Sequence, residues 1–328
     1  MSKYFTSLML LLAFACPVVA QTSQPTEPES QMEVDPDPSD EAKSDETEAK
    51  VADANEEGFI TLHAGVDFTT QYFRNGIFQE NKGVIAQPHI ELQMHLYRSN
   101  GPISDIYLFA RSWNSFHSGP TGTSSNLSNS PAAWYETQLT AGMGVELFRV
   151  LQVSGGYTAQ VSPNDRFDTV EELFIRGDLA DKRLWNLDGE IGPIGWEFDG
   201  IRLYGFFVWE TDGQRDGGVN RGVYAEVGAK PGVTLHPCDD FTVSLSVPVR
   251  VGFNVFEYQE VQNKGDAPFG FFTLGFEGEV PLKWIPSRYG EWSLYGAMHW
   301  LHLGQNAARF NNRNNDEIIA TGGVRFNY

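Results

Sequence analysis

Cysteine is almost absent from this chain of 328 residues, which contains only Cys16 and Cys238. Cys16 lies in an N-terminal segment with the composition of a cleaved secretory signal, so we expect a single thiol and no internal disulfide in the mature chain. A secreted chain without disulfides must obtain its stability from packing and backbone hydrogen bonds.

Basic residues are also scarce, because 23 Lys and Arg stand against 43 Asp and Glu, for a formal net charge of -20. Residues 21–57 alone hold thirteen of the acids and only two Lys, so this short segment carries about half of the excess negative charge. It has no aromatic residue and cannot bury enough apolar surface to fold, so we expect a disordered acidic linker. The linker contains no basic patch, which argues against nucleic acid as a partner.

Long apolar runs are missing after the first twenty residues, since no stretch reaches the roughly 18 apolar residues that a membrane-spanning helix needs. Residues 1–20 begin with a basic Lys3, continue through an apolar run and end on Val-Val-Ala, which predicts a signal peptide cleaved after Ala20. The expected organisation is a signal peptide (1–20), the acidic linker (21–57) and one folded unit (58–328).

Catalytic motifs are missing as well: the sequence has no GK dipeptide of a P-loop, no GxSxG, no HExxH and no CxxC. We therefore predict no enzymatic activity, no cofactor and no metal site. The nearest hydrolase candidate is His117-Ser118, but neighbouring strand residues point to opposite faces. The nearest metal candidate is the turn with His236, Cys238, Asp239 and Asp240, for which a plain polar turn is the stronger interpretation.

The folded unit is instead rich in period-two patterns. In residues 84–97, VIAQPHIELQMHLY, apolar side chains alternate with amides, imidazoles and a carboxylate, which is typical of a strand with two different faces. Similar stretches recur to the end of the chain, and we predict about twelve strands. Residues 180–200 are ambiguous, so ten or fourteen strands remain alternatives.

Strand length and loop asymmetry favour a transmembrane barrel over a soluble β-sandwich. Many strands approach the ~9 to 11 residues that cross a bilayer at a tilt. Short turns, among them the PGVTLHPCDD stretch, alternate with long polar loops at residues 117–131, 211–221, 254–268 and 304–316, as in outer-membrane barrels. Aromatic residues cluster near strand ends as expected of interfacial girdles: Tyr72, Phe73, Phe78, Trp134, Tyr135, Trp209, Trp284, Trp292 and Trp300.

The last strand ends the chain on an aromatic residue, Tyr328, in an uninterrupted non-polar register from Ile318. This pattern predicts recognition of the C-terminus by the barrel-assembly machinery of the bacterial outer membrane. With an even number of strands, the chain enters and leaves the barrel on the same side of the membrane. We therefore expect the acidic linker in the periplasm of a Gram-negative cell. The predicted fold is a closed, antiparallel, up-and-down transmembrane β-barrel surrounded by lipid.

The polar faces of the strands then point into the lumen. If the first two strands form a hairpin around residue 78, Asp67 lies near His89 and His63 near Gln93, within about two residues. Pro88 lacks an N–H, so we predict a bulge or a break in pairing there. The candidate pore-lining residues are His63, Asp67, His89, Glu91, His95, Glu136, Glu172, Arg176, Arg202, Glu226, Arg250, Glu277, Glu317 and Arg325.

The stretch VDFTTQYFRNGIFQE (residues 66–80) resembles the opening hairpin of the TorF-type porin family, in which an aromatic-Arg-Gly-Ile pattern is followed by Gln. Here Asn75 is an extra residue between the Arg and the Gly. The stretches IRLYGFFVWETDG, GVYAEVGAKPGVTL, FTVSLSVPVRVGF and GGVRFNY are similar to the second half of that family. The resemblance extends over much of residues 58–328 and implies a pore without a defined substrate.

Together these observations predict a porin-like outer-membrane channel for passive diffusion of small hydrophilic solutes. A barrel with a closed lumen that acts as a structural or adhesion protein through its outer loops is the alternative, and ion pairs that plug the lumen would favour it. The sequence predicts neither the solute nor the oligomeric state.

Overall fold

The computed structural model describes residues 59–119, 133–192, 194–214, 220–238, 241–259 and 267–328. The predicted signal peptide and acidic linker lie outside these residues, as do Asp239 and Asp240, so the expectations for them stay predictions.

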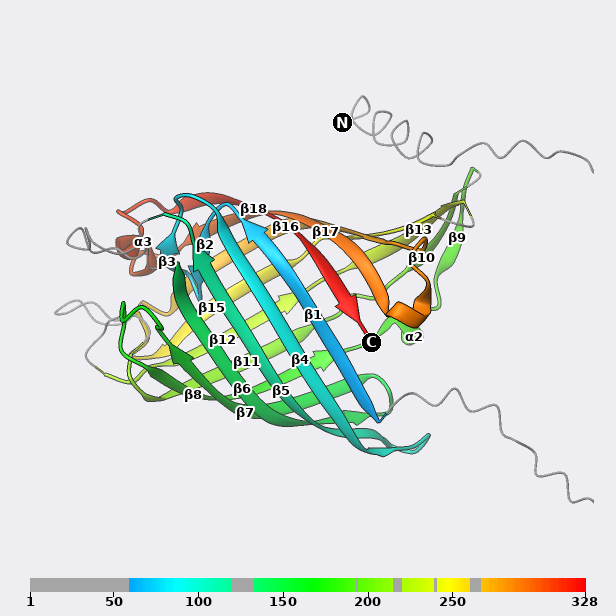
Figure 1. Cartoon of the computed structure of the whole chain (residues 1–328), viewed down its shortest axis with the longest axis horizontal. Helices are drawn as coiled ribbons and strands as arrows, with labels where there is room; N and C mark the ends of the chain where they lie inside the picture. The colour runs from blue at the N-terminus through cyan, green and yellow to red at the C-terminus, as the bar shows by residue number, and fades with distance from the viewer. Residues whose placement is uncertain (1–58, 120–132, 193, 215–219, 239–240, 260–266) are drawn as a thin grey trace, which may run out of the picture.

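Twelve antiparallel strands form a closed barrel (Figure 1), which confirms the predicted fold class and the central strand count. β18 closes the ring by pairing with both β17 and β1. In order around the ring, the strands are β1 (Ile60–Thr69), β4 (Ile85–Arg98), β5 (Ile103–His117), β6 (Trp134–Leu147), β7 (Leu151–Val161), β8 (Val170–Leu179), β11 (Tyr204–Asp212), β12 (Val223–Ala229), β15 (Val249–Phe256), β16 (Phe269–Pro281), β17 (Glu291–Leu303) and β18 (Asp316–Asn327).

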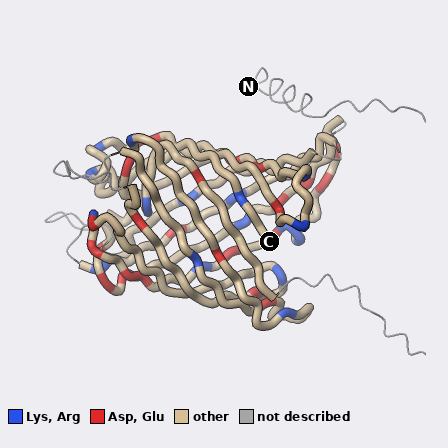
Figure 2. Tube along the Cα trace, viewed as in Figure 1, with Lys and Arg blue, Asp and Glu red and all other residues tan. Residues whose placement is uncertain are grey.

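The outer face of the barrel is apolar, because the period-two pattern directs one set of side chains outward on every strand. Leu92, Met143, Ile175, Phe276 and Met298, each on a different strand, are between 44% and 58% exposed. A continuous apolar exterior of this kind is unfavourable in water and suits a lipid environment. Charged positions are scattered along the strands among long uncharged stretches (Figure 2).

None of the helices in the described part of the chain is long and apolar enough to cross a membrane. They are single turns at the ends of the barrel: α2 (Lys182–Trp185), the 3-10 turn η1 (Ser287–Tyr289) and α3 (Ala307–Phe310).

The start of β1 and the end of β18 lie at the same end of the barrel, which we call the terminal end (Figure 1). The short connections at residues 99–102, 148–150 and 282–290 join strands there, and so do two long connections at residues 180–203 and 230–248. The predicted long polar loops join strands at the opposite, loop end. The predicted short turns are therefore confirmed at three connections of the terminal end, while the other two are long.

Four further strands extend the wall beyond the terminal end and form a flap: β9 (Asp188–Ile191), β10 (Ile194–Phe198), β13 (Gly232–Cys238) and β14 (Phe241–Ser246). The prediction of a compact turn in PGVTLHPCDD was wrong, because β13 pairs with β10 on one side and β14 on the other. Val233 and Leu235 alternate with Thr234 and His236, a strand pattern hidden between flanking Pro and Asp residues. The ambiguous residues 180–200 form α2, β9 and β10.

The connection between β1 and β4 contains a small hairpin, β2 (Tyr72–Arg74) and β3 (Ile77–Glu80), which folds into the barrel at the loop end (Figure 1). Its two turn residues, Asn75 and Gly76, have φ angles of 48° and 81°. Positive φ at both positions is what a type I′ turn requires, and Asn-Gly is the preferred pair. The additional Asn75 of the sequence motif is therefore half of the turn.

Two details of the first strands were predicted from sequence. The ladder between β4 and β5 has pairs at Ala86 and His89 but none at the two residues between them, so the break predicted at Pro88 is confirmed without a shift in register. The ladder from β4 to β1 continues through Pro88, opposite Val66. Backbone N–H groups at odd-numbered positions of β4 point toward β1, so those at even-numbered positions point toward β5. The N–H that Pro88 lacks would therefore have pointed toward β5.

Candidate functional site

The interior wall of the barrel carries polar and charged side chains. All of the predicted lumen residues except Arg202 lie on barrel strands, on the face opposite the exposed apolar residues. The structure therefore provides a polar lumen enclosed by an apolar exterior, and the arrangement of the charges within it decides what the lumen can do.

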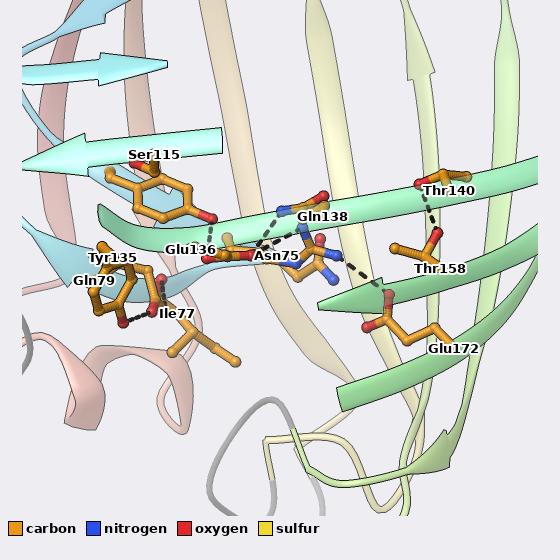
Figure 3. Close-up of polar contacts among 12 residues, drawn as sticks. Asn75, Ile77, Gln79, Ser115, Tyr135, Glu136, Gln138, Thr140, Thr158 and Glu172 are labelled. Atoms are coloured by element: carbon orange, nitrogen blue, oxygen red, sulfur yellow. Dashed lines mark hydrogen bonds and ion pairs between the residues drawn. The ribbon is translucent and has the colours of Figure 1, made fainter. Parts of the chain in front are cut away.

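The β2–β3 hairpin crosses this lumen from one wall to the other. On one side the Tyr72 hydroxyl donates to Glu136 of β6 at 2.9 Å, and the Tyr135 hydroxyl donates to Gln79 at 2.6 Å (Figure 3). On the other side Gly76 lies against the ring of Phe271 on β16. Since β6 and β16 are half the ring apart, the hairpin spans the full width of the barrel.

Arg74 fixes the hairpin electrostatically. Its guanidinium lies 3.7 Å from a carboxylate oxygen of Glu136 and 3.2 Å from one of Glu172. Both carboxylates are almost completely buried, with 0% and 3% exposure. Charges in such surroundings are stable only when they are paired, so Arg74 and the two glutamates depend on each other.

An apolar cluster holds the tip of the hairpin on the opposite wall. Ile77, which is 4% exposed, packs with Tyr224, Phe271 and Leu301 from β12, β16 and β17, and with Ala307 of α3. The predicted assignment of Tyr72, Phe73, Phe78 and Tyr135 to an interfacial girdle was wrong, because the hairpin folds inward and these rings fill the lumen.

Directly against the hairpin, the lumen retains a cavity of about 290 Å³. Tyr72 and Asn75 contribute to its lining from the hairpin, and Gln87, Arg250 and Thr321 from the barrel wall. The hairpin therefore divides the lumen, with an apolar anchor at the loop end and a polar chamber beside it.

Ion pairs line the wall from β8 to β15. Arg176 donates to both carboxylate oxygens of Asp178, at 2.7 and 2.6 Å. Glu226 accepts hydrogen bonds from the hydroxyls of Tyr204 and Tyr224, and Arg250 lies 4.0 Å from it. The structure thus brings together three of the predicted residues, Arg176, Glu226 and Arg250, through tyrosines between them.

A second set of pairs lines β16 to β18. Glu277 lies between Lys230 and His299, whose Nε2 is 3.3 Å from its carboxylate. Arg325 lies 3.2 Å from Glu279 and covers the ring of a neighbouring tyrosine. The predicted residues Glu277 and Arg325 are therefore each paired, but not with one another.

The third set lies on β1, β4 and β5 toward the terminal end. His95 is 2.7 Å from Asp105, and Glu91 is 2.5 Å from Arg111. His63 contacts the side chain of Asn327 at 2.8 Å. All three sequence candidates in this region, His63, Glu91 and His95, have polar partners from neighbouring strands.

The pairing of β1 with β4 differs by two residues from the predicted pairing. Asp67 pairs with Gln87, and His63 with Glu91, whereas His89 lies opposite Gly65. This difference is within the predicted range, and it arises because the ladder is centred on residue 77 instead of residue 78. One carboxylate oxygen of Asp67 is buried without a hydrogen bond to any described residue.

Two predicted lumen residues have other roles. Glu317 accepts hydrogen bonds from Gln71, Asn311 and Asn314 at 3.0, 2.9 and 2.6 Å, and so ties the loops together at the rim. The prediction that Arg202 lies on a strand was wrong. It precedes β11 with a φ of 51°, and its guanidinium donates to a backbone carbonyl at the junction with the flap.

That junction is organised by Asp181, which is 2% exposed. Its carboxylate accepts hydrogen bonds from the Trp185 indole at 2.6 Å and from the backbone N–H groups of Ile201 and Arg202 at 3.0 and 2.8 Å. Burial opposes the charged form, but these three donors outweigh it and hold the pKa of Asp181 below its ordinary value. The carboxylate therefore stabilises the junction above the ordinary pKa of an aspartate, and this contribution is lost only as the pH falls through the lowered pKa.

Asp181→Asn should loosen the flap junction. An amide presents N–H groups where one carboxylate oxygen now accepts, so one donor loses its partner at a cost of about 1–3 kcal/mol. We expect faster hydrogen exchange in residues 180–203 at neutral pH, with no change in the barrel strands. Asp188→Asn, at an exposed position of the flap, is the matched control. Equal exchange in both variants would contradict the assignment.

The hydrolase candidate His117-Ser118 does not form a hydrogen-bonded pair in the described part of the chain. His117 forms a hydrogen bond of 2.7 Å with Ser115 rather than with Ser118, because residues two apart share a strand face. Both partners are at most 1% exposed beneath the hairpin. Within the described residues, no group of three His, Cys, Asp or Glu side chains gathers as a metal site.

Sequence reasoning missed several residues on which the lumen depends. Arg74 was part of the hairpin motif, but only the folded hairpin shows its glutamate partners. Tyr204 and Tyr224 share the inward register with Glu226, so the period-two pattern contained a signal for them. Lys230 lies outside a regular strand and had no such signal.

No family model and no curated protein matches the chain. Among solved structures, the NanC porin is 12% identical over 80% of this chain and 98% of that chain, with a TM-score of 0.39. An outer membrane channel from Pseudomonas putida F1 is 10% identical over 82% and 94%, with a TM-score of 0.39. LpxR from Salmonella typhimurium is 9% identical over 81% and 99%, with a TM-score of 0.42.

These values are too low to carry an argument about activity. Membership of the TorF-type family and the absence of enzymatic activity therefore stay predictions.

Proposed function

We propose that this protein is a porin-like channel of the bacterial outer membrane, through which small hydrophilic solutes diffuse passively, and that the β2–β3 hairpin is its constriction. In this arrangement the terminal end faces the periplasm, where the acidic linker begins, and the loop end faces outward. The proposal includes recognition of Tyr328 by the barrel-assembly machinery.

The observation that carries the proposal is a polar chamber inside a barrel with an apolar exterior, in which the β2–β3 hairpin crosses the lumen. Barrels of about eight strands are filled by side chains and those of about sixteen hold wide channels, so twelve strands leave room for a narrow pore. The wall charges are paired within a strand or with nearby strands of the wall, and they leave the centre of the barrel to the hairpin. The TorF-type resemblance supports the same function.

The experiment is planar-bilayer recording of the refolded mature protein, together with liposome swelling in neutral sugars. We expect small or intermittent currents from the wild type, because the hairpin spans the lumen. Replacement of residues 71–80 by a short Gly-Ser linker should give larger, steady currents.

A closed-lumen structural or adhesion barrel is the second candidate. The buried Arg74 ion pairs and the apolar cluster around Ile77 favour it, because both seal the loop end. Absence of current from both the wild type and the hairpin-replaced protein would favour this second function over the channel.

A further inference from the structure

The chamber beside the hairpin contains an arginine whose end groups are not committed. Arg250 donates from Nε to the hydroxyl of Thr273 at 3.1 Å, and its Nη1 lies 4.0 Å from Glu226, beyond hydrogen-bond distance. Neither terminal nitrogen forms a hydrogen bond to another residue in the described parts of the chain. The Arg250 side chain is 42% exposed and lines the cavity.

The other lumen cations differ from Arg250 in this respect. Arg176 forms two short hydrogen bonds with Asp178, Arg325 lies 3.2 Å from Glu279, and Arg74 has two buried glutamates. Their charges are used in holding the fold together, whereas the end of the Arg250 guanidinium remains available to a molecule in the chamber.

Glu226 does not take up those free donors. Each of its two oxygens accepts a hydrogen bond from a tyrosine hydroxyl, Tyr204 on one and Tyr224 on the other. The ring of Phe271 lies 5.8 Å from the Arg250 guanidinium and supports its orientation. The arginine is thus held in place by its Nε and the aromatic ring, and its partly exposed side chain lines the cavity.

The chamber also offers hydrogen-bonding groups for hydroxyls. Gln87 and Thr321 line it together with Arg250. A ligand that suits both kinds of group carries a carboxylate for the arginine and hydroxyl groups for these amide and hydroxyl side chains. A guanidinium edge matches a carboxylate with two parallel hydrogen bonds.

We infer that this cavity is a transient binding site for small hydroxylated carboxylates, anchored by Arg250. The volume of about 290 Å³ limits the ligand to a molecule of few carbons. Neighbouring Glu226 weakens the attraction for an anion, which suits a channel, because a permeating solute must also leave. The inference rests on the proposed channel function and names its solute class.

The test compares gluconate with glucose, which has the same carbon chain without the charge. Gluconate should reduce the wild-type current at low salt in a concentration-dependent way, and glucose should not. Arg250→Gln should raise the half-blocking concentration at least about tenfold, while Arg250→Lys should shift it less. Arg149→Gln removes the same charge from an exposed turn between β6 and β7 and serves as the control.

Saturation-transfer NMR of gluconate with the detergent-solubilised protein detects binding at the same site independently of any current. A signal that Arg250→Gln removes supports the site even in a barrel that does not conduct. A conducting wild type that gluconate neither blocks nor contacts overturns the inference and leaves the channel standing. Equal block of the wild type and Arg250→Gln also overturns it.

Discussion

Replacing Arg74 with Met is expected to release the hairpin and raise the channel conductance several-fold. The substitution leaves Glu136 and Glu172 buried without a cation, and breaking a buried pair in this way costs about 3–5 kcal/mol. Since about 1.4 kcal/mol corresponds to a factor of ten, the equilibrium constant for docking of the hairpin falls by a factor of about 100 to 4,000. Single-channel recording, with circular dichroism to confirm the intact barrel, measures the result.

The triple variant Arg74→Met, Glu136→Gln, Glu172→Gln is the matched control. It removes the uncompensated charges, while the amide oxygen that replaces the carboxylate at position 136 still offers the Tyr72 hydroxyl an acceptor. The hairpin should therefore dock again, and the conductance should return toward the wild type. If Arg74→Met and the triple variant conduct alike, the ion pairs do not hold the hairpin.

The second large effect is the converse, a hairpin locked in place by a disulfide. A Cβ built on Gly76 lies 3.5 Å from the Cβ of Phe271, within the range of about 3.5–4.5 Å that disulfides span. Gly76→Cys with Phe271→Cys, in a Cys238→Ser background, should therefore link the hairpin to the opposite wall. We expect the oxidised protein to pass almost no current, and reduction to restore it.

Each single-cysteine variant controls for strain, because Gly76 has a φ of 81° and a side chain there costs about 1–3 kcal/mol. Neither single variant should respond to reductant. Full current through the oxidised double variant would show that solutes bypass the hairpin.

The barrel itself was predictable because its determinants are local. Alternation in stretches such as residues 84–97 assigns each side chain to the lipid or the lumen, and a one-residue error would reverse the whole face. The break at Pro88 was predictable for the same reason, since it depends only on a missing N–H.

The hairpin was not predictable, because its position depends on contacts distant in sequence. The run from Tyr72 to Glu80 is aromatic and looks like a strand end at a membrane interface, whereas in the structure Arg74 contacts Glu172, almost a hundred residues away. Charge partners such as Lys230 and Glu277 likewise depend on which strands become neighbours.

The flap was missed for a different reason. β13 is short and lies between Pro231 and an acidic turn, and local composition of that kind indicates a turn. Pairing with β10 and β14 overrides that tendency, and a single sequence does not show which strands will be available to pair.

The most direct test of the central claim is single-channel recording of the refolded mature protein beside the variant in which residues 71–80 are replaced by a Gly-Ser linker. We predict small, intermittent currents from the wild type and larger, steady currents from the variant. Equal currents would show that the hairpin is not the constriction, and the absence of current from both would contradict a channel altogether.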